Sequence, residues 1–598
     1  MIYYNPLDQF YKNKIGAVVK NEKITFRVKG DFSCVSFCCK KDGEDYISQQ
    51  MQKKCDYFEV EITFSSGLYF YHFDCDGKFL GNSAEFLGVF SNQKEDFQLT
   101  VYEHDFSVPE WVYGGTIYQI FPDRFNRGEK EKKVPSHKVL HENWNDMPVF
   151  LPNENGEIIN NDFFGGDIKG IIKKLDYIKS LGVNIIYLNP IFKAFSNHRY
   201  DTGDYMQIDD LLGTMEDFKT LIEKAKEKNI QLVLDGVFNH TGDDSLYFNK
   251  YNRYQSVGAY QDKNSKYYSW YNFIDYPDDY ESWWGIKTLP TINESNEDYI
   301  NYITGESGVI EFYTKLGIGG WRLDVVDELP AEFVKKIREA VKRNNSNAIL
   351  IGEVWEDATN KISYGKRREY FQGKELDSVM NYPLKNAILE FVKYGNSKAL
   401  SYTIKEQMDH YPHIALHALM NILSTHDTIR LLSNLSGENI NGKSKSQLAN
   451  LNISQENLKF AKFKLKVATL LQYTLMGVPT IYYGDEVGMQ GYIDPLNRQT
   501  YPWGNEDKET YDWYVFLSKL RAEYSAFTCG NFEELYKDNG VFIYKRFDEN
   551  SEILIAVNIS NQDICLEFDD ALFEIITHTK HKNYYQLNKN SLAVFVNN

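Results

Sequence analysis

The stretch Gln231-Leu-Val-Leu-Asp-Gly-Val-Phe-Asn-His240 is a short apolar run that ends in polar side chains. A run of this length, bounded by turn residues, is typical of a strand buried in a parallel sheet. Two later segments repeat the pattern, because Gly320-Trp-Arg-Leu-Asp324 and Ala348-Ile-Leu-Ile-Gly-Glu353 each end in a carboxylate. In a parallel barrel the carboxyl ends of all strands open onto one face, so we expect these polar tips to meet there.

Apolar segments of this kind recur eight times in the middle of the chain, separated by stretches with helical periodicity. They begin at Thr116, Asn184, Gln231, Gly320, Ala348, Ser378, Asn421 and Thr480. One connecting stretch is regular enough to predict a helix, since apolar residues recur every three or four positions from Ile168 to Ile178 and Gly182 would end it. The pattern predicts an α/β fold, a (β/α)8 TIM barrel, with a long excursion over residues 241–295 after the third strand.

The two ends of the chain have a different pattern. Residues 1–108 alternate short β-rich runs with Gly, Asp and Asn turns, which is typical of a β-sandwich. The same alternation returns after residue 520. We therefore expect an N-terminal β-sandwich over 1–108, the barrel over 109–520 and a C-terminal β-sandwich over 521–598.

The composition restricts the partners and the compartment. The 598 residues carry a formal net charge of −18, and both nucleic acid and anionic membranes need basic patches, so neither is expected as a partner. No segment reaches the roughly 18 apolar residues of a membrane helix. Seven cysteines, an odd count, and the absence of a signal-like amino terminus favour a cytoplasmic protein. A secreted protein whose signal has already been removed is the alternative.

The strand-end residues suggest a chemistry. Arg322 lies two positions before Asp324 and points to the same side of its strand, where its guanidinium would keep a nucleophilic carboxylate ionised. Asp324 and Asp427, the end of Ser424-Thr-His-Asp427, would favour a protonated Glu353. Two carboxylates, one nucleophile and one acid, are what cleavage of a glycosidic bond needs. Each acid alone could be a helix cap or an ion-pair partner, but their joint arrival at successive strand ends favours catalysis.

These segments, in this order, resemble the conserved regions of the α-amylase superfamily of retaining glycoside hydrolases. Leu289-Pro-Thr-Ile-Asn293 is similar to the short motif that marks the neopullulanase, cyclomaltodextrinase and maltogenic amylase group. The segments Asn197 to Tyr205 and Asp162 to Asp167 resemble the same group. The resemblance implies that the N-terminal sandwich is like a carbohydrate-binding module.

The resemblance also implies a role for each site residue. Asp324 would be the nucleophile and Glu353 the acid, and Asp427 would grip the sugar hydroxyls beside the reacting carbon. Substrate binding would fall to His198, Tyr200, His240, Arg322, Trp355 and His426. Asp235 would have a supporting role that orients Arg322 or the nucleophile loop. Trp283 and Trp284 leave two interpretations open, a platform for sugars or a hydrophobic plug.

No metal and no other cofactor is expected. In relatives, the segment after the first barrel strand supplies oxygen ligands to calcium, which needs six to eight oxygens. Here Arg127, Lys130, Lys132 and Lys133 stand where ligands are expected, and these cations would repel the ion. A basic side chain that reaches Asp167 would supply the missing positive charge.

Taken together, the resemblance implies a hydrolase of α-1,4 bonds, with some α-1,6 cleavage, acting on maltodextrins, cyclodextrins or pullulan. The partner would be an α-glucan, and the protein a homodimer in which one subunit's N-terminal sandwich narrows the other's active site. One alternative is a transferase such as a branching enzyme, which shares every catalytic residue; the motif at 289–293 favours the hydrolase. The other is a non-catalytic glucan-binding protein, which the retained acids oppose.

Overall fold

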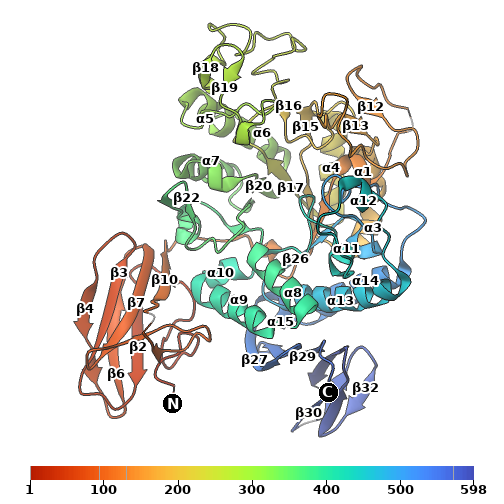
Figure 1. Ribbon diagram of the computed structural model, residues 1–598. Coiled ribbons are helices and arrows are strands. Elements are labelled where there is room, and N and C mark those ends of the chain that lie inside the picture. Colours follow the sequence, from red (N-terminus) through yellow and green to blue (C-terminus); the bar gives the residue numbers. More distant parts are fainter. Residues whose placement is uncertain (1, 93, 130, 570, 598) are drawn as a thin grey trace.

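The computed structural model describes residues 2–92, 94–129, 131–569 and 571–597. Eight parallel strands form a central barrel in the order β24-β21-β20-β17-β14-β11-β26-β25, and a bridge between Met380 and Met420 links its two ends (Figure 1). The strands are β11 (Ile117–Ile120), β14 (Ile185–Leu188), β17 (Gln231–Gly236), β20 (Gly320–Leu323), β21 (Ile349–Gly352), β24 (Ser378–Val379), β25 (Met420–Asn421) and β26 (Val478–Tyr482). The predicted TIM barrel is confirmed.

Two details of the barrel differ from the sequence-based expectation. The seventh strand ends at Asn421, where the prediction began it. Its ladder partner Pro479 has no N–H to donate, so the pairing stops there. The helix predicted from Ile168 is two short helices, α2 (Ile168–Lys173) and α3 (Leu175–Ser180), because Lys174 leaves helical geometry with φ −107° and ψ 6°.

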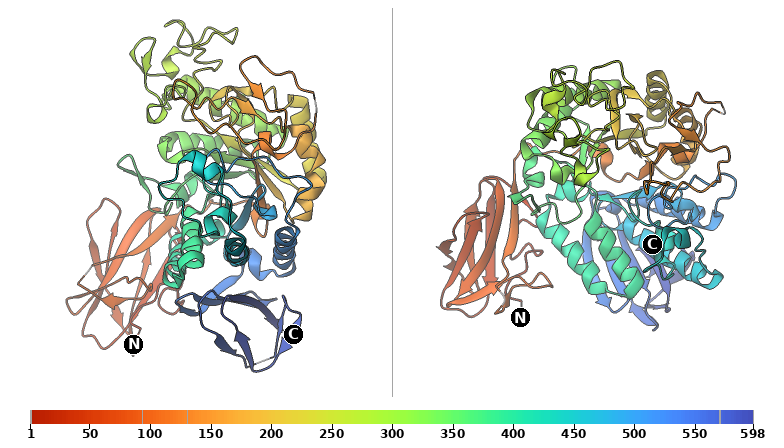
Figure 2. Two further views of the ribbon diagram at one scale, coloured as in Figure 1. Left: turned by 45° about the vertical axis from the view of Figure 1, so that its right-hand side comes forward. Right: turned by 45° about the horizontal axis from the view of Figure 1, so that its top comes forward.

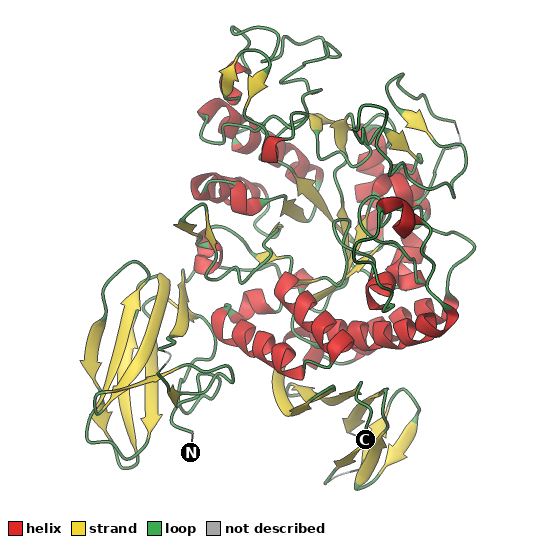
Figure 3. Cartoon of the chain, viewed as in Figure 1, coloured by secondary structure: helices red, strands yellow, loops and turns green. Residues whose placement is uncertain are grey.

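Helices surround the barrel, as Figure 3 shows in red. The main ones are α4 (Met215–Glu227), α5 (Glu297–Thr304), α6 (Val309–Leu316), α7 (Ala331–Asn344), α8 (Tyr382–Tyr394), α9 (Ser397–His410), α13 (Gln455–Thr474) and α14 (Lys508–Glu523). Helix α7 shows why they pack: its buried residues Phe333, Val334, Ile337 and Val341 recur with helical spacing and face the sheet.

Three excursions rise from the carboxyl side of the strands and are seen at the top of Figure 1. They contain the short strand pairs β12 (Val139–Leu140) with β13 (Asp162–Phe163), β15 (Phe192–Ala194) with β16 (Thr202–Ile208), and β18 (Phe273–Asp275) with β19 (Asp279–Tyr280). The third pair lies in the excursion predicted over 241–295. Long loops at this end of a barrel commonly carry binding residues.

The N-terminal sandwich lies beside the barrel in both views of Figure 2. One sheet contains β1 (Val18–Val19), β3 (Val35–Lys41), β4 (Ile47–Gln50), β7 (Gly67–Cys75), β8 (Lys78–Gly81), β9 (Val89–Phe90) and β10 (Phe97–Tyr102); the other contains β2 (Lys23–Lys29), β5 (Gln52–Lys53) and β6 (Tyr57–Thr63). Between the sheets lies an aromatic core that includes Phe26, Phe37, Tyr71 and Phe97.

The C-terminal sandwich is smaller. Its six-stranded sheet contains β27 (Asn531–Asp538), β28 (Val541–Phe547), β29 (Glu552–Asn558), β31 (Leu572–Glu574), β32 (Thr579–His581) and β34 (Ser591–Asn597), and β30 (Ile564–Glu567) pairs with β33 (Tyr584–Leu587). Within the described residues all seven cysteines are free thiols. None of the described helices combines the length and apolar character needed to cross a bilayer.

Candidate active site

Strand register brings the predicted catalytic residues together. Asp235 on β17 lies directly opposite Arg322 on β20, and Leu323 lies opposite Gly352 on β21. The next residues along these two strands are Asp324 and Glu353, so both acids emerge side by side at the carboxyl end of the barrel. A one-residue slip of either strand would separate them.

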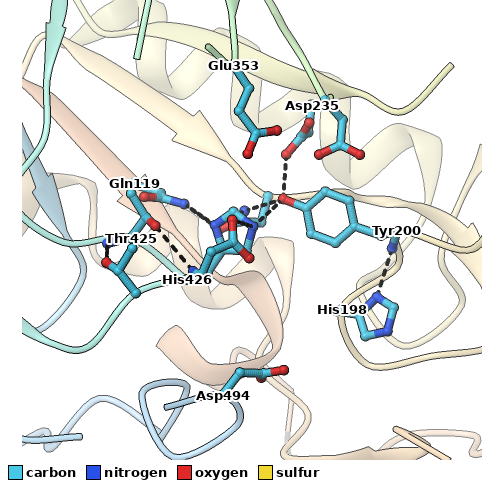
Figure 4. Close-up of polar contacts among 12 residues, drawn as sticks. Gln119, His198, Tyr200, Asp235, Glu353, Thr425, His426 and Asp494 are labelled. Carbon is cyan, nitrogen blue, oxygen red and sulfur yellow. Dashed lines mark hydrogen bonds and ion pairs between the residues drawn. The ribbon is translucent and has the colours of Figure 1, made fainter. Parts of the chain in front are cut away.

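Arg322 connects these acids. Its buried guanidinium donates Nη1 to Asp235 Oδ1 and Asp324 Oδ1, both at 2.7 Å, and Nη2 lies 2.7 Å from Glu353 Oε2. Three carboxylates therefore share one positive charge. Figure 4 shows Glu353 and Asp235 on the same side of the site.

This charge balance affects protonation. Burial raises the pKa of Asp324 well above its usual range; Arg322 lowers it, and the negative charges of Glu353 and Asp235 raise it again. The predicted contact with Arg322 is present, and it opposes the larger effect of burial. Because three carboxylates face one guanidinium, the positive charge of Arg322 offsets only part of their mutual repulsion.

The backbone after the nucleophile position is strained. Val325 adopts φ 39°, in the left-handed region that β-branched residues rarely enter. This conformation directs its N–H to Glu353 Oε2 at 3.0 Å, while Trp355 Nε1 donates to Glu353 Oε1 at 3.2 Å. Strained backbone conformations of this kind cluster at active sites and ligand-binding sites. The Glu353 carboxyl group is thereby fixed from both sides.

Asp235 accepts hydrogen bonds from three protein side chains. Its Oδ2 accepts hydrogen bonds from the hydroxyl groups of Tyr187 at 2.6 Å and Tyr200 at 2.8 Å, while Oδ1 accepts from Arg322. Both of its carboxylate oxygens are thus engaged by protein donors, and the residue is 2% exposed. This agrees with the supporting role predicted for it.

His426 lies at the centre of a polar chain that Figure 4 draws in dashes. Its Nδ1 is 2.9 Å from Gln119 Nε2 and 3.2 Å from Asn189 Nδ2; since both amide nitrogens donate, Nδ1 accepts and Nε2 carries the proton. Nε2 is 2.6 Å from the Tyr200 hydroxyl and 3.1 Å from Asp427 Oδ2. Burial lowers the pKa of His426 well below its usual range, so the ring is neutral.

Two further predicted sugar-binding residues, His198 and His240, contact Tyr200 and Trp283 respectively. His198 shares a loop with Tyr200, whose N–H donates to His198 Nδ1 at 3.1 Å. His240 is stacked on Trp283 with ring centroids 5.3 Å apart, and burial lowers the pKa of His240 to about 4. Its buried Nε2 has no hydrogen-bond partner among the described residues, so this atom can bond a ligand.

Two of the tryptophans beside the site, Trp355 and Trp284, are exposed to solvent. Trp355 stacks on Tyr382 at a centroid distance of 3.8 Å and is 45% exposed. The indole N–H groups of Trp283 and Trp284 donate to opposite oxygens of Glu328, both at 2.8 Å. Because Trp284 is 79% exposed, it fits the platform interpretation better than the hydrophobic plug.

The sequence-based analysis missed several polar residues of the site. Arg498 lies 3.4 Å from Asp427 Oδ1 and 2.9 Å from Asp494, which Figure 4 places below His426. Gln119 could have been suspected, because it is a polar residue inside the apolar strand β11. Arg498 follows the last strand in a loop without periodicity, so no local pattern marked it.

The loop after β11 does not fit calcium. Lys132 Nζ lies 2.5 Å from Asp167 Oδ2, so a basic side chain reaches Asp167 as predicted. Asp167 also accepts backbone N–H groups of Gly128 at 2.8 Å and Gly170 at 2.6 Å. Arg127 donates to three backbone carbonyl groups, those of Phe164, Glu142 and His141. Lys130 lies outside the described residues.

Comparison with known proteins places the barrel and its site in a known family. A family model described as "Alpha amylase, catalytic domain" matches residues 119–512. The chain belongs to the alpha-amylase family. The matched region contains Asp324, Glu353 and Asp427, so the site described above lies within the alpha-amylase catalytic domain.

Relatives within the alpha-amylase family differ in length. The chain is 34% identical to an amylopullulanase of Thermoanaerobacterium saccharolyticum over 96% of its own length but only 50% of that protein, so it spans half of this relative. It is 32% identical to a cyclomaltodextrinase of Thermoanaerobacter pseudethanolicus, over 85% of this chain and 82% of that one. A solved structure, the type III pullulan hydrolase from Thermococcus kodakarensis, matches over the full length of both chains with a TM-score of 0.70 and 25% identity.

Proposed function

We propose that this protein is a retaining α-glucan hydrolase that cleaves α-1,4 bonds, and also α-1,6 bonds, in maltodextrins, cyclodextrins or pullulan. The observation that carries the proposal is the arrangement of Asp324 and Glu353 at adjacent strand ends, both in contact with the Arg322 guanidinium. Relatives named cyclomaltodextrinase and pullulan hydrolase support the substrate class.

In the proposed first step, Asp324 attacks the anomeric carbon while Glu353 gives its proton to the departing glycosidic oxygen. The carbon–oxygen bond breaks as the bond to Asp324 forms. In the second step Glu353, now ionised, takes a proton from water, which displaces Asp324 and restores the starting state. Arg322 stays charged throughout and balances whichever carboxylate is ionised.

The sugar in the reacting position is proposed to be held by five side chains. Asp427, His240 and His426 would bond its hydroxyl groups, and Tyr200 would stack on its ring with His198 nearby. Tyr200 and His426 are already parallel, with an interplanar angle of 7°, so the wall they form needs no rearrangement. Trp355, beside Glu353, would contact the leaving-group sugar.

Further features are proposed for the whole protein. The sandwich over 1–108 would be a carbohydrate-binding-module-like domain, followed by the barrel over 109–520 and the sandwich over 521–598. A homodimer and a cytoplasmic location are proposed, the latter supported by the free thiols. The enzyme would work without calcium at Asp167, because Lys132 occupies that position.

Substitution of the two acids tests the proposal. We expect Asp324→Asn and Glu353→Gln each to lose at least about 10³-fold in kcat on maltoheptaose while melting like the wild type, because both belong to one two-step displacement. Incubation of the wild type with cyclodextrin, pullulan and maltoheptaose identifies the products. New branch formation without net release of reducing ends would favour the transferase alternative, and binding without any turnover would favour the non-catalytic one.

A further inference from the structure

The loop that follows Glu353 is bonded to the N-terminal sandwich of its own chain. Gln98 on β10, which is 4% exposed, donates Nε2 to Thr359 Oγ1 at 2.8 Å and accepts at Oε1 from Asn360 Nδ2 at 2.8 Å. A second contact joins Asp42 to Arg367 Nε at 2.9 Å. Figure 1 shows β10 beside the hairpin of β22 (Ile362–Ser363) and β23 (Lys366–Arg367), which belongs to this loop.

Asp357 is the residue that organises the loop. It lies four positions after Glu353. Its Oδ1 accepts from Thr359 N at 2.9 Å and Thr359 Oγ1 at 2.8 Å, and its Oδ2 accepts from Asn360 Nδ2 at 3.2 Å and His410 Nδ1 at 2.7 Å. One carboxylate therefore fixes the loop to itself and to helix α9.

The end of α9 is also bonded to the N-terminal segment of the chain. Asp409 forms a buried ion pair with Lys12 at 2.6 Å. The Tyr411 hydroxyl accepts from Ala358 N at 3.1 Å, and the Tyr411 carbonyl accepts from Ala17 N at 3.2 Å. The residues on both sides of His410, Asp409 and Tyr411, thus bond the N-terminal segment or the loop of residues 354–367 after Glu353, called here the acid loop. The N-terminal segment and the acid loop are therefore parts of one network.

We infer that Asp357 and His410 are positioning residues that hold Glu353 and Trp355 against the leaving-group side of the substrate, with the N-terminal sandwich of the same chain as their support. Only Glu356 separates Trp355 from Asp357. Trp355 in turn donates to the Glu353 carboxyl group. Release of the loop at Asp357 therefore moves the residue that orients the acid. This inference rests on the proposed function.

The expected effect is large, because proton transfer depends on position. A positioned general acid contributes about 10²–10⁴-fold, and a displacement of about 1 Å can cost 10²-fold. The loss should fall on substrates whose leaving group needs a proton. A substrate whose leaving group departs as an anion should be nearly unaffected.

Two substrates of different leaving-group chemistry make the test. In maltoheptaose the broken C–O bond needs a proton from Glu353; in α-maltosyl fluoride the C–F bond breaks, fluoride leaves as the anion, and Asp324 forms the same bond to carbon. Comparison of kcat/KM, which reports only the steps through leaving-group departure, isolates the first step. We expect Asp357→Ala to lower kcat/KM about 10–100-fold on maltoheptaose and less than about threefold on α-maltosyl fluoride.

Paired variants separate positioning from general damage. His410→Ala should behave like Asp357→Ala, whereas His410→Asn keeps an N–H donor near the former Nδ1 and should restore most of the activity on maltoheptaose. Glu85→Ala is the matched control, since it breaks a contact of 2.5 Å between the N-terminal sandwich and Lys537 on β27 without touching the loop of residues 354–367. If Asp357→Ala does not fold, Asp357→Asn gives the same comparison.

Each outcome decides the inference. A selective loss on maltoheptaose, with rescue by His410→Asn, supports it. Equal losses on both substrates, or no loss in Asp357→Ala, overturn it. A wild-type protein that turns over neither substrate would instead refute the proposed function.

Discussion

The ion pair between Lys132 and Asp167 gives a sharp prediction about stability. The side chains are 8% and 3% exposed and lie 2.5 Å apart, so they form a buried pair. Removing one partner of a buried pair costs about 3–5 kcal/mol, because the remaining charge is left without compensation. Asp167 keeps hydrogen bonds from the backbone N–H groups of Gly128, Glu129 and Gly170. We therefore expect Lys132→Met to cost about 3 kcal/mol, the lower end of that range.

Urea unfolding followed by tryptophan fluorescence measures this loss, with Lys169→Met as the control. Lys169 on α2 pairs with Glu129, which lies in the same loop as Lys132. Because both side chains are about half exposed, Lys169→Met should have no measurable effect on the free energy of unfolding. Chelator should not change the unfolding of the wild type. A calcium ion at a free concentration a hundred times its dissociation constant would add about 2.7 kcal/mol to the free energy of unfolding. Equal effects of the two variants, or loss of stability in EDTA that calcium alone restores, would refute the reasoning.

Two other predictions concern a buried acid and the assembly. Burial raises the pKa of Glu375 from 4.5 to about 7, and neither carboxylate oxygen has a hydrogen-bond partner among the described residues. The folded state therefore favours the neutral carboxylic acid. The stability contributed by this protonated form is lost as pH rises from about 4.5 through 7. The free energy of unfolding of Glu375→Gln should therefore rise relative to that of the wild type, by up to about 3 kcal/mol, as the pH is raised from about 5 to about 8. A difference between the two proteins that stays constant across this range would contradict the prediction. Light scattering should give twice the mass of the 69.8 kDa chain, and a monomer at micromolar concentration would exclude the proposed dimer.

The barrel and the acids at its strand ends could be predicted because local patterns encode them. Apolar runs marked the strands, and the two-residue alternation placed Arg322 and Asp324 on one side of β20. Contacts between distant loops could not be predicted in this way. Arg498 and Asp427 are 71 positions apart, and Gln98 and Thr359 are 261 apart. Their proximity depends on how irregular loops fold over the barrel, which periodicity does not describe.

The same limit explains the errors in detail. The apolar spacing from Ile168 to Ile178 continues through Lys174, so periodicity alone could not reveal that the helix divides there. The contact between Arg322 and Asp324 was expected to decide the charge of the nucleophile. Burial has the larger effect on that carboxyl group, and burial is a property of the folded site rather than of the motif.

The stereochemistry of the first product tests the central claim most directly. Two displacements at one carbon, first by Asp324 and then by water, leave the configuration unchanged. Proton NMR of maltoheptaose hydrolysis, recorded in the first minutes before mutarotation, should show newly released α-anomeric sugar. Initial release of the β-anomer would mean that water attacks the substrate directly, and would contradict the assignment of Asp324 as nucleophile.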